Sequence, residues 1–186
     1  MKKATLFYEW TSLPKDDFRI LVMLADNGPF TGTLSDICRY FFLNPQNKTR
    51  ASIRTSIEAL TNQQYITGQL QGYTYRLWAI PQEQKIDMPC DWLRRLRSHE
   101  YSSEAVSWEN VLKVFLWIAH HNSNEIVTNK DIAADLHISS STIVSAKNVL
   151  LHEFEAISKE YITTKIGTNF YQRLGQHLTA SAWWKE

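Results

Sequence analysis

Residues 129–151, with the sequence NKDIAADLHISSSTIVSAKNVLL, constrain the fold more than any other part of the chain. Their apolar positions recur at helical spacing on both sides of a short polar stretch, which predicts two helices joined by a tight turn. Thr128 or Asn129 is expected to cap the first helix and Ser139 the second, because short polar side chains accept hydrogen bonds from free backbone amides. The second helix contains one basic residue, Lys147, so its shape and its charge suggest different roles.

The predicted elements follow the same order in both halves of the chain: three helices, and then two strands separated by a turn. Apolar side chains recur at helical spacing in each helix, and β-branched and aromatic residues are concentrated in each strand. The two halves share little residue identity, so the duplication lies in the order of the elements. The predicted helices are 13–28, 33–43 and 47–64, then 107–122, 128–136 and 139–154; the predicted strands are 65–70, 73–80, 156–166 and 170–174.

A polar segment between two prolines, PQEQKIDMP at residues 81–89, is typical of a linker between the halves. It is followed by DWLRRLR, residues 91–97, in which apolar and basic side chains separate onto two sides of a short helix. A connecting helix is favoured for this stretch, and a clamp on the DNA backbone is the alternative. The predicted domains are therefore 1–80 and 105–186, with a linker and connecting helix at 81–104.

The segment DIAADLHISSSTIVSAKNVL resembles the winged-helix superfamily, a variant of the helix-turn-helix. His137 departs from the family's pattern, which usually has glycine in the turn, although histidine tolerates a positive φ better than a β-branched residue does. The resemblance implies a mainly α fold with small β-hairpins (α+β class), arranged as two tandem winged-helix domains. Four residues match the pattern: Ala133 at the inner contact of the second helix, Ile138 after the turn, Ser139 as the cap of the third helix, and Ile143 packing back on the second helix.

The whole arrangement is similar to bacterial, plasmid and phage proteins with tandem winged helices, which regulate transcription, initiate replication or organise a replisome. Residues 18–41 resemble the start of such replication proteins. The resemblance implies binding of double-stranded DNA in transcription regulation or replication initiation. Because folds host many functions, a second hypothesis is a scaffold or dimerisation module that uses winged helices without contacting nucleic acid. Its expected partner is a second copy of the chain, or a replication or transcription protein.

Basic residues are concentrated in the first half, although the whole chain carries a net charge of only +1. Residues 1–80 contain nine Lys and Arg against six Asp and Glu, and residues 37–57 contain four basic residues and no acid. In a winged helix the third helix enters the major groove, where Arg pairs with guanine or phosphate and hydroxyls bind phosphate. An ordinary solvated helix face is the alternative. The expected DNA-binding residues on this helix are Lys48, Thr49, Arg50, Ser52, Arg54 and Thr55.

The third helix of the second half has a weakly charged surface that suits DNA contact and a packing or dimer role equally. Nearby Asp131, Asp135, Glu153 and Glu155 oppose an anionic partner. Arg76 in the first hairpin, and Lys165 and Asn169 beside the tip of the second, are further expected contacts, with ordinary solvated charges as the alternative. The residues expected on the exposed face of the helix are Ser140, Ser141, Val144, Ser145, Lys147 and Asn148.

The sequence contains no catalytic or metal-binding constellation. Its six glycines are dispersed, so there is no phosphate-binding glycine loop, and the adjacent His120 and His121 point about 100° apart on a helix. No enzyme activity, cofactor or metal is therefore expected. Two cysteines, and no apolar run of about 18 residues, indicate a soluble cytosolic protein with reduced thiols and no membrane segment. Trp183 and Trp184 are compatible with a dimer contact or with docking onto the body of the protein.

Overall fold

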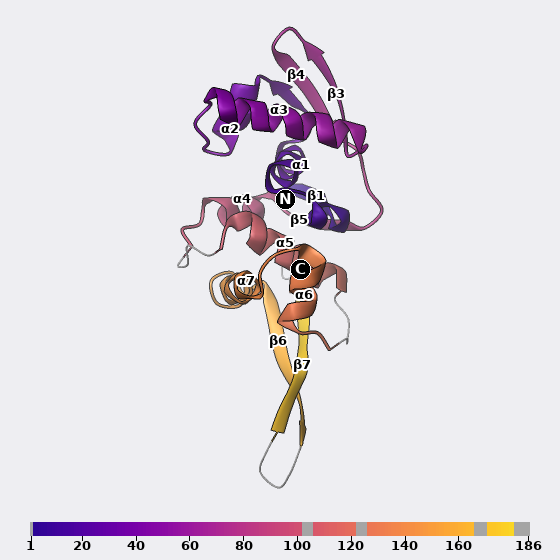
Figure 1. Ribbon diagram of the computed structural model, residues 1–186, viewed down its shortest axis with the longest axis vertical. Coiled ribbons are helices and arrows are strands. Elements are labelled where there is room, and N and C mark those ends of the chain that lie inside the picture. The colour runs from indigo at the N-terminus through magenta and orange to yellow at the C-terminus, as the bar shows by residue number, and fades with distance from the viewer. Residues whose placement is uncertain (1, 102–105, 122–125, 166–170, 181–186) are drawn as a thin grey trace. The chain divides into compact units, whose positions relative to one another are not determined.

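The computed structural model divides into two compact units, Met1–Leu93 and Arg94–Glu186. Its described part contains seven α-helices, one 3-10 helix and seven strands in three small antiparallel sheets (Figure 1). The α+β class predicted from the sequence is confirmed. None of the described helices is both long enough and apolar enough to cross a bilayer. The described residues are 2–101, 106–121, 126–165 and 171–180.

Three helices form the core of the first unit: α1 (Lys15–Asn27), α2 (Leu34–Tyr40) and α3 (Asn47–Asn62). α3 packs against α1 and α2 through one apolar face, on which Ile53 and Leu60 are fully buried. This face follows the spacing of three to four residues that predicted the helix, and it leaves the opposite face of α3 in solvent.

Local signals set the ends of these helices. Pro14 precedes α1, and Gly28 ends it with a φ of +83°, which glycine adopts without a steric penalty. Thr33 and Asp36 form a capping box at the start of α2, in which each side chain accepts a hydrogen bond from the backbone amide of the other residue. The hydrogen bonds from the Thr33 amide and hydroxyl hold the pKa of Asp36 below its ordinary value.

A three-stranded antiparallel sheet in the order β2-β4-β3 lies beside α3 in the first unit. The predicted hairpin is confirmed as β3 (Ile66–Gln71) and β4 (Thr74–Ala79), with Gly72 in its turn. The third strand, β2 (Phe30–Gly32), pairs with the other edge of β4. The sequence did not predict β2, because three residues are too few to show an alternating pattern.

The segment predicted to be a linker contributes a strand instead. β5 (Lys85–Pro89) pairs antiparallel with β1 (Lys3–Phe7), which is followed by a 3-10 helix, η1 (Tyr8–Ser12). The Thr5 hydroxyl of β1 donates to the Asp87 carboxylate of β5 at 2.7 Å across 82 residues of sequence. Glu83, Gln84 and Lys85 are exposed, whereas Met88 and Pro89 are buried. The polar composition therefore reflects the exposed residues rather than a lack of structure, and no local pattern reveals so distant a pairing.

The predicted connecting helix is present as α4 (Cys90–Ser98). Trp92 and Leu96 are buried, whereas Arg94 and Arg95 are exposed, so the apolar and basic sides separate as the sequence predicted. The boundary between the two compact units falls within α4, between Leu93 and Arg94.

Three helices are followed by a hairpin in the second unit as in the first, without counterparts of β1, η1 and β5 among its described residues, and the hairpin projects from the helices (Figure 1). The strand pairing is repeated as well. In the first unit β2 pairs with β4, and in the second Val127 forms an isolated bridge with Gln176 in the last strand. The elements are α5 (Trp108–His121), α6 (Asn129–Leu136), α7 (Ser140–His152), β6 (Ile157–Lys165) and β7 (Tyr171–Ala180).

The turn between α6 and α7, at residues 137–139, has the caps that the sequence predicted. The Thr128 hydroxyl caps α6, which decides between the two alternatives, and the Ser139 hydroxyl caps α7. Ile143 is buried as expected, whereas Ile138 is only half-buried, because it lies in the turn, where one side faces solvent.

His137 ends α6 in the left-handed region, with φ 53° and ψ 38°. A Cβ in that region costs free energy that glycine avoids. We expect His137→Gly to raise the free energy of unfolding by about 1 kcal/mol. This net gain includes an opposing contribution, because glycine has greater conformational freedom in the unfolded chain. Urea denaturation measures this change. His137→Ala keeps the Cβ and is expected to give no gain; a less stable glycine variant would show that the imidazole itself contributes stabilising contacts.

Candidate nucleic-acid interface

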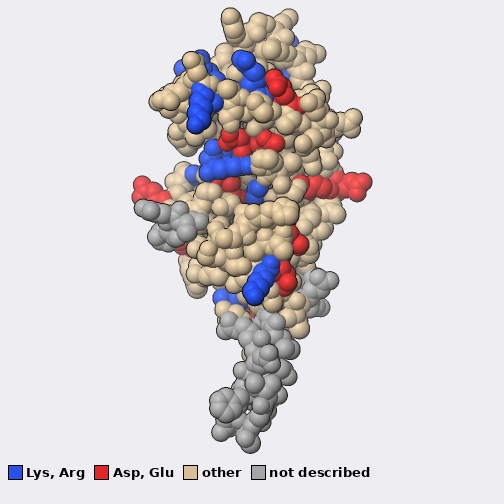
Figure 2. All heavy atoms as spheres, in the orientation of Figure 1, with Lys and Arg blue, Asp and Glu red and all other residues tan. Residues whose placement is uncertain are grey.

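The solvent-facing side of α3 carries basic and hydroxyl side chains, as the sequence predicted. Lys48, Arg54 and Thr55 are exposed, Thr49 and Arg50 are half-buried, and no acidic residue lies in the first turn of the helix. Figure 2 shows Lys and Arg side chains over the region of α2 and α3, with Asp and Glu side chains close beside them. The surface around α3 is therefore mixed in charge, and the placement of individual side chains decides what it can bind.

A groove of about 790 Å³ lies between α3, the start of α2 and the tip of the β3–β4 hairpin. Tyr73, 89% exposed, and Leu70, 57% exposed, contribute its hairpin wall. Five side chains of α3 line the groove at helical spacing and form a single row, here called the α3 stripe. Of the six α3 residues predicted to bind DNA, Arg50 and Arg54 line the groove and the other four do not. The α3 stripe consists of Asn47, Arg50, Ala51, Arg54 and Glu58.

Hydrogen bonds distinguish the stripe from the other predicted residues of α3. Within the groove, the Arg50 guanidinium donates to the Asn47 side-chain oxygen at 2.6 Å, which fixes its direction. Outside the groove, the Ser52 hydroxyl donates to the Asp16 carboxylate of α1 at 2.7 Å, and the Thr55 hydroxyl donates to a backbone carbonyl one turn earlier at 3.1 Å. The hydroxyl of Ser52 is thus engaged beside a carboxylate, which disfavours a phosphate at that position.

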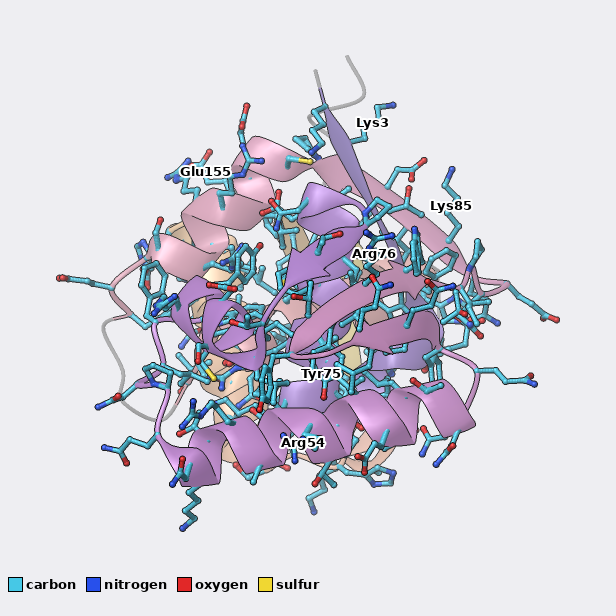
Figure 3. The ribbon with its side chains drawn as sticks, turned by 90° about the horizontal axis from the view of Figure 1, so that it is seen from above. Lys3, Arg54, Tyr75, Arg76, Lys85 and Glu155 are labelled. Atoms are coloured by element: carbon cyan, nitrogen blue, oxygen red, sulfur yellow. The ribbon has the colours of Figure 1, made fainter. Side chains whose placement is uncertain are left out.

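Arg76 is exposed on β4 but does not line the groove. Its neighbour Tyr75 does, and successive side chains of a strand point to opposite faces of the sheet. Figure 3 shows Tyr75 between β4 and α3, on the side of Arg54, and Arg76 on the side of β4 away from α3. The structure therefore separates Arg76 from the arginines of the α3 stripe.

The predicted serine and asparagine side chains of α7 are at the surface. Ser140, Ser141 and Asn148 are exposed, and Ser145 is half-buried. Val144 lies among them and is 41% exposed. This face offers neutral hydrogen-bonding groups around an apolar side chain.

Lys147 is a correction to the prediction for α7: it is 4% exposed and does not lie on the outer face. Its ammonium donates to the side-chain oxygens of Asn129 at 2.5 Å and Gln176 at 2.8 Å, and the Gln176 amide donates to Asn129 at 2.9 Å. Lys147 lies one turn after the buried Ile143, so its stem follows the apolar face of the helix to these two amides. Because α7 has no other Lys or Arg, its exposed face carries neither.

Some predicted features lie outside the described residues. These are Asn169, Trp183 and Trp184. Lys165 is the last residue of β6, and its side chain also lies outside the described part.

Glu58 and Tyr73 are groove residues that the sequence prediction missed. Glu58 lies one turn after Arg54, so extending the spacing of the predicted basic residues by a single turn would have found it. Tyr73 was assigned to a strand, whereas it lies in the hairpin turn beside Gly72. Tyr73 reaches the groove because the β3–β4 hairpin lies beside α3, and local sequence does not reveal that packing between elements.

The groove contains hydrogen-bond donors and acceptors suited to recognition of a ligand. Across the described ranges, no cluster of three or more His, Cys, Asp and Glu is arranged to hold a metal ion. Cys38 is fully buried, and burial raises the pKa of its thiol, which disfavours a nucleophilic role. In comparisons with known proteins, no protein-family model matches the chain, and no curated protein matches it.

Proposed function

We propose that the protein binds double-stranded DNA through two winged helices, with the first unit as the main contact. Two features support this fold. In each unit a helix, a short extended segment, two helices and a hairpin follow one another. The extended segment pairs with the last strand of the hairpin, as strand β2 in the first unit and as a bridge at Val127 in the second. The resemblance of the α6–α7 segment to winged-helix proteins extends the proposal to transcription regulation or replication initiation in a bacterium, phage or plasmid.

The observation that carries the proposal is the placement of Arg50 and Arg54 in one groove between α3 and the β3–β4 hairpin. The major groove of DNA, about 12 Å wide, admits one α-helix. Arginine binds phosphate or guanine through two parallel hydrogen bonds, and the free amides at the start of α3 add a positive field. A helix with these side chains, flanked by a hairpin, is suited to one strand of a duplex lying along the groove.

Salt dependence tests this proposal. If α3 neutralises roughly three phosphates, the logarithm of the association constant falls with a slope of about −2.7 against the logarithm of salt concentration. Raising the salt from about 50 to about 200 mM should then weaken binding of the full chain to a duplex by about 40-fold. Fluorescence anisotropy with a labelled duplex of mixed sequence measures this change. A duplex affinity that does not vary with salt would contradict a contact through phosphates.

A second candidate function, protein–protein contact, applies to the second unit. The exposed face of its helix α7 carries no Lys or Arg and presents Val144. Such a face suits contact with a protein, including a second copy of the chain, better than contact with phosphates. The same titration separates the two functions. If the full chain binds no duplex at about 50 mM salt, where binding to phosphates is strongest, the interaction scaffold becomes the better explanation for both units.

A further inference from the structure

We infer that Arg54 and Glu58 read a guanine and a cytosine in the major groove, an inference that rests on the proposed DNA binding and gives it a sequence preference. Both side chains are exposed, line the same groove and lie one helical turn apart on the α3 stripe. A carboxylate in this position opposes binding to phosphates, because each phosphate carries a negative charge. Glu58 therefore suits a ligand group that donates hydrogen bonds.

Base edges in the major groove supply such a group. Guanine presents two acceptors, O6 and N7, which match the fork of donors on arginine, and cytosine presents the N4 amino group, which donates to a carboxylate. Side chains four residues apart on a helix have Cβ atoms about 5–6 Å apart. That spacing lets Arg54 and Glu58 reach the two bases of one pair or of adjacent pairs, which are stacked about 3.4 Å apart.

Both side chains are available for such contacts. Within the described residues, the side chains of Arg54 and Glu58 form no hydrogen bond or ion pair, whereas the Arg50 side chain is held by Asn47. An arginine that precedes a glutamate by four residues is the less favourable of the two orders for pairing along a helix, which agrees with their separation here. Arg54 therefore keeps all its donors, and Glu58 keeps its acceptors.

One further residue of the stripe, Ala51, favours close approach of α3 to bases. Ala51 is exposed and lies between the Arg50 and Arg54 positions, so no long side chain holds the helix backbone away from a base edge there. Its methyl group suits contact with the methyl group of thymine. The stripe thus combines Ala51, and an Arg50 side chain held by Asn47, with the Arg54–Glu58 pair further along.

The test is a site selection followed by measurement of base preference. The full chain is first used to select duplexes from a randomised pool, and each position of the selected site is then varied in competition titrations. At one base pair, Glu58→Gln should reduce the preference for cytosine by about ten-fold, because a side-chain amide offers both a donor and an acceptor. Binding of Glu58→Gln to unrelated duplexes should become stronger, because a negative charge is removed.

Two further variants isolate the effect. Arg54→Lys keeps the charge but loses the planar fork, so it should lose about ten-fold of guanine preference at the same or a neighbouring base pair while the salt slope stays unchanged. Glu83→Gln removes one exposed negative charge outside the groove and should leave all base preferences as they are. Circular dichroism checks that each variant is folded.

Two results would overturn the inference, and they are distinguishable. If Glu58→Gln strengthens binding to all duplexes equally and changes no base preference, Glu58 reads no base, and the DNA-binding proposal still stands. If the wild-type chain binds no duplex even at about 50 mM salt, the DNA-binding proposal fails together with the inference.

Discussion

Replacing Arg50 and Arg54 together with alanine is expected to weaken duplex binding by about 3 kcal/mol, or roughly 150-fold in the dissociation constant. Both side chains line the groove, and neither packs in the apolar core of the first unit. The loss therefore comes from missing contacts to phosphates and bases rather than from unfolding. A titration of the double variant beside the wild type, at one salt concentration, measures the difference.

The matched control for this double variant is Lys2→Ala with Lys3→Ala. These lysines are exposed in the same unit and outside the groove, so their removal changes the net charge by the same amount. We expect them to weaken binding by less than about ten-fold, through the general field alone. Equal losses in the two double variants would show that net charge, and not the groove, determines binding.

Truncating Lys147 to alanine is expected to lower the free energy of unfolding by about 2–4 kcal/mol. The ammonium is buried, and its removal leaves the side-chain oxygens of Asn129 and Gln176 without their charged donor. Burial of polar groups without partners costs free energy, and the lost stem leaves a cavity. Urea unfolding measures the change.

Two variants define the cause of that loss. Lys147→Met keeps most of the volume but not the donor, so it should remain well below wild-type stability; full stability would show that packing alone matters at this position. Lys130→Ala removes an exposed lysine from α6 and should change stability by less than about 0.5 kcal/mol. Where the Lys147 variants are folded, their affinity for DNA should equal that of the wild type, in contrast to the double arginine variant.

The helices, the hairpins and several caps follow from local sequence. In α3, burial of Ile53 and Leu60 obeys the periodicity that predicted the helix, and the Ser139 cap of α7 obeys a local preference. His137 illustrates how a residue that departs from a family pattern still marks a special backbone conformation. These features depend on residues within one or two turns of each other, which a single sequence displays.

Features that depend on distant partners could not be predicted in the same way. Lys147 is buried because Asn129 and Gln176, 18 and 29 residues away, supply its acceptors. Charge alone predicts an exposed lysine, and periodicity does not reveal two amides from other elements. The candidate site shows the same division: Arg54 was found from its own helix, whereas the hairpin wall of the groove depends on how the hairpin packs beside α3.

The position of Gln176 has a consequence for how the second unit opens. Its backbone exchanges hydrogen bonds with Val127 at 3.0 and 2.9 Å, while its side chain is bound to Lys147 of α7 and Asn129 of α6. Separation of the hairpin from the helices therefore breaks main-chain and side-chain bonds at once and exposes a buried charge. We therefore expect the backbone amides of Val127 and Gln176 to exchange hydrogen through one common opening event, in which the two helices and β7 separate as one cooperative unit.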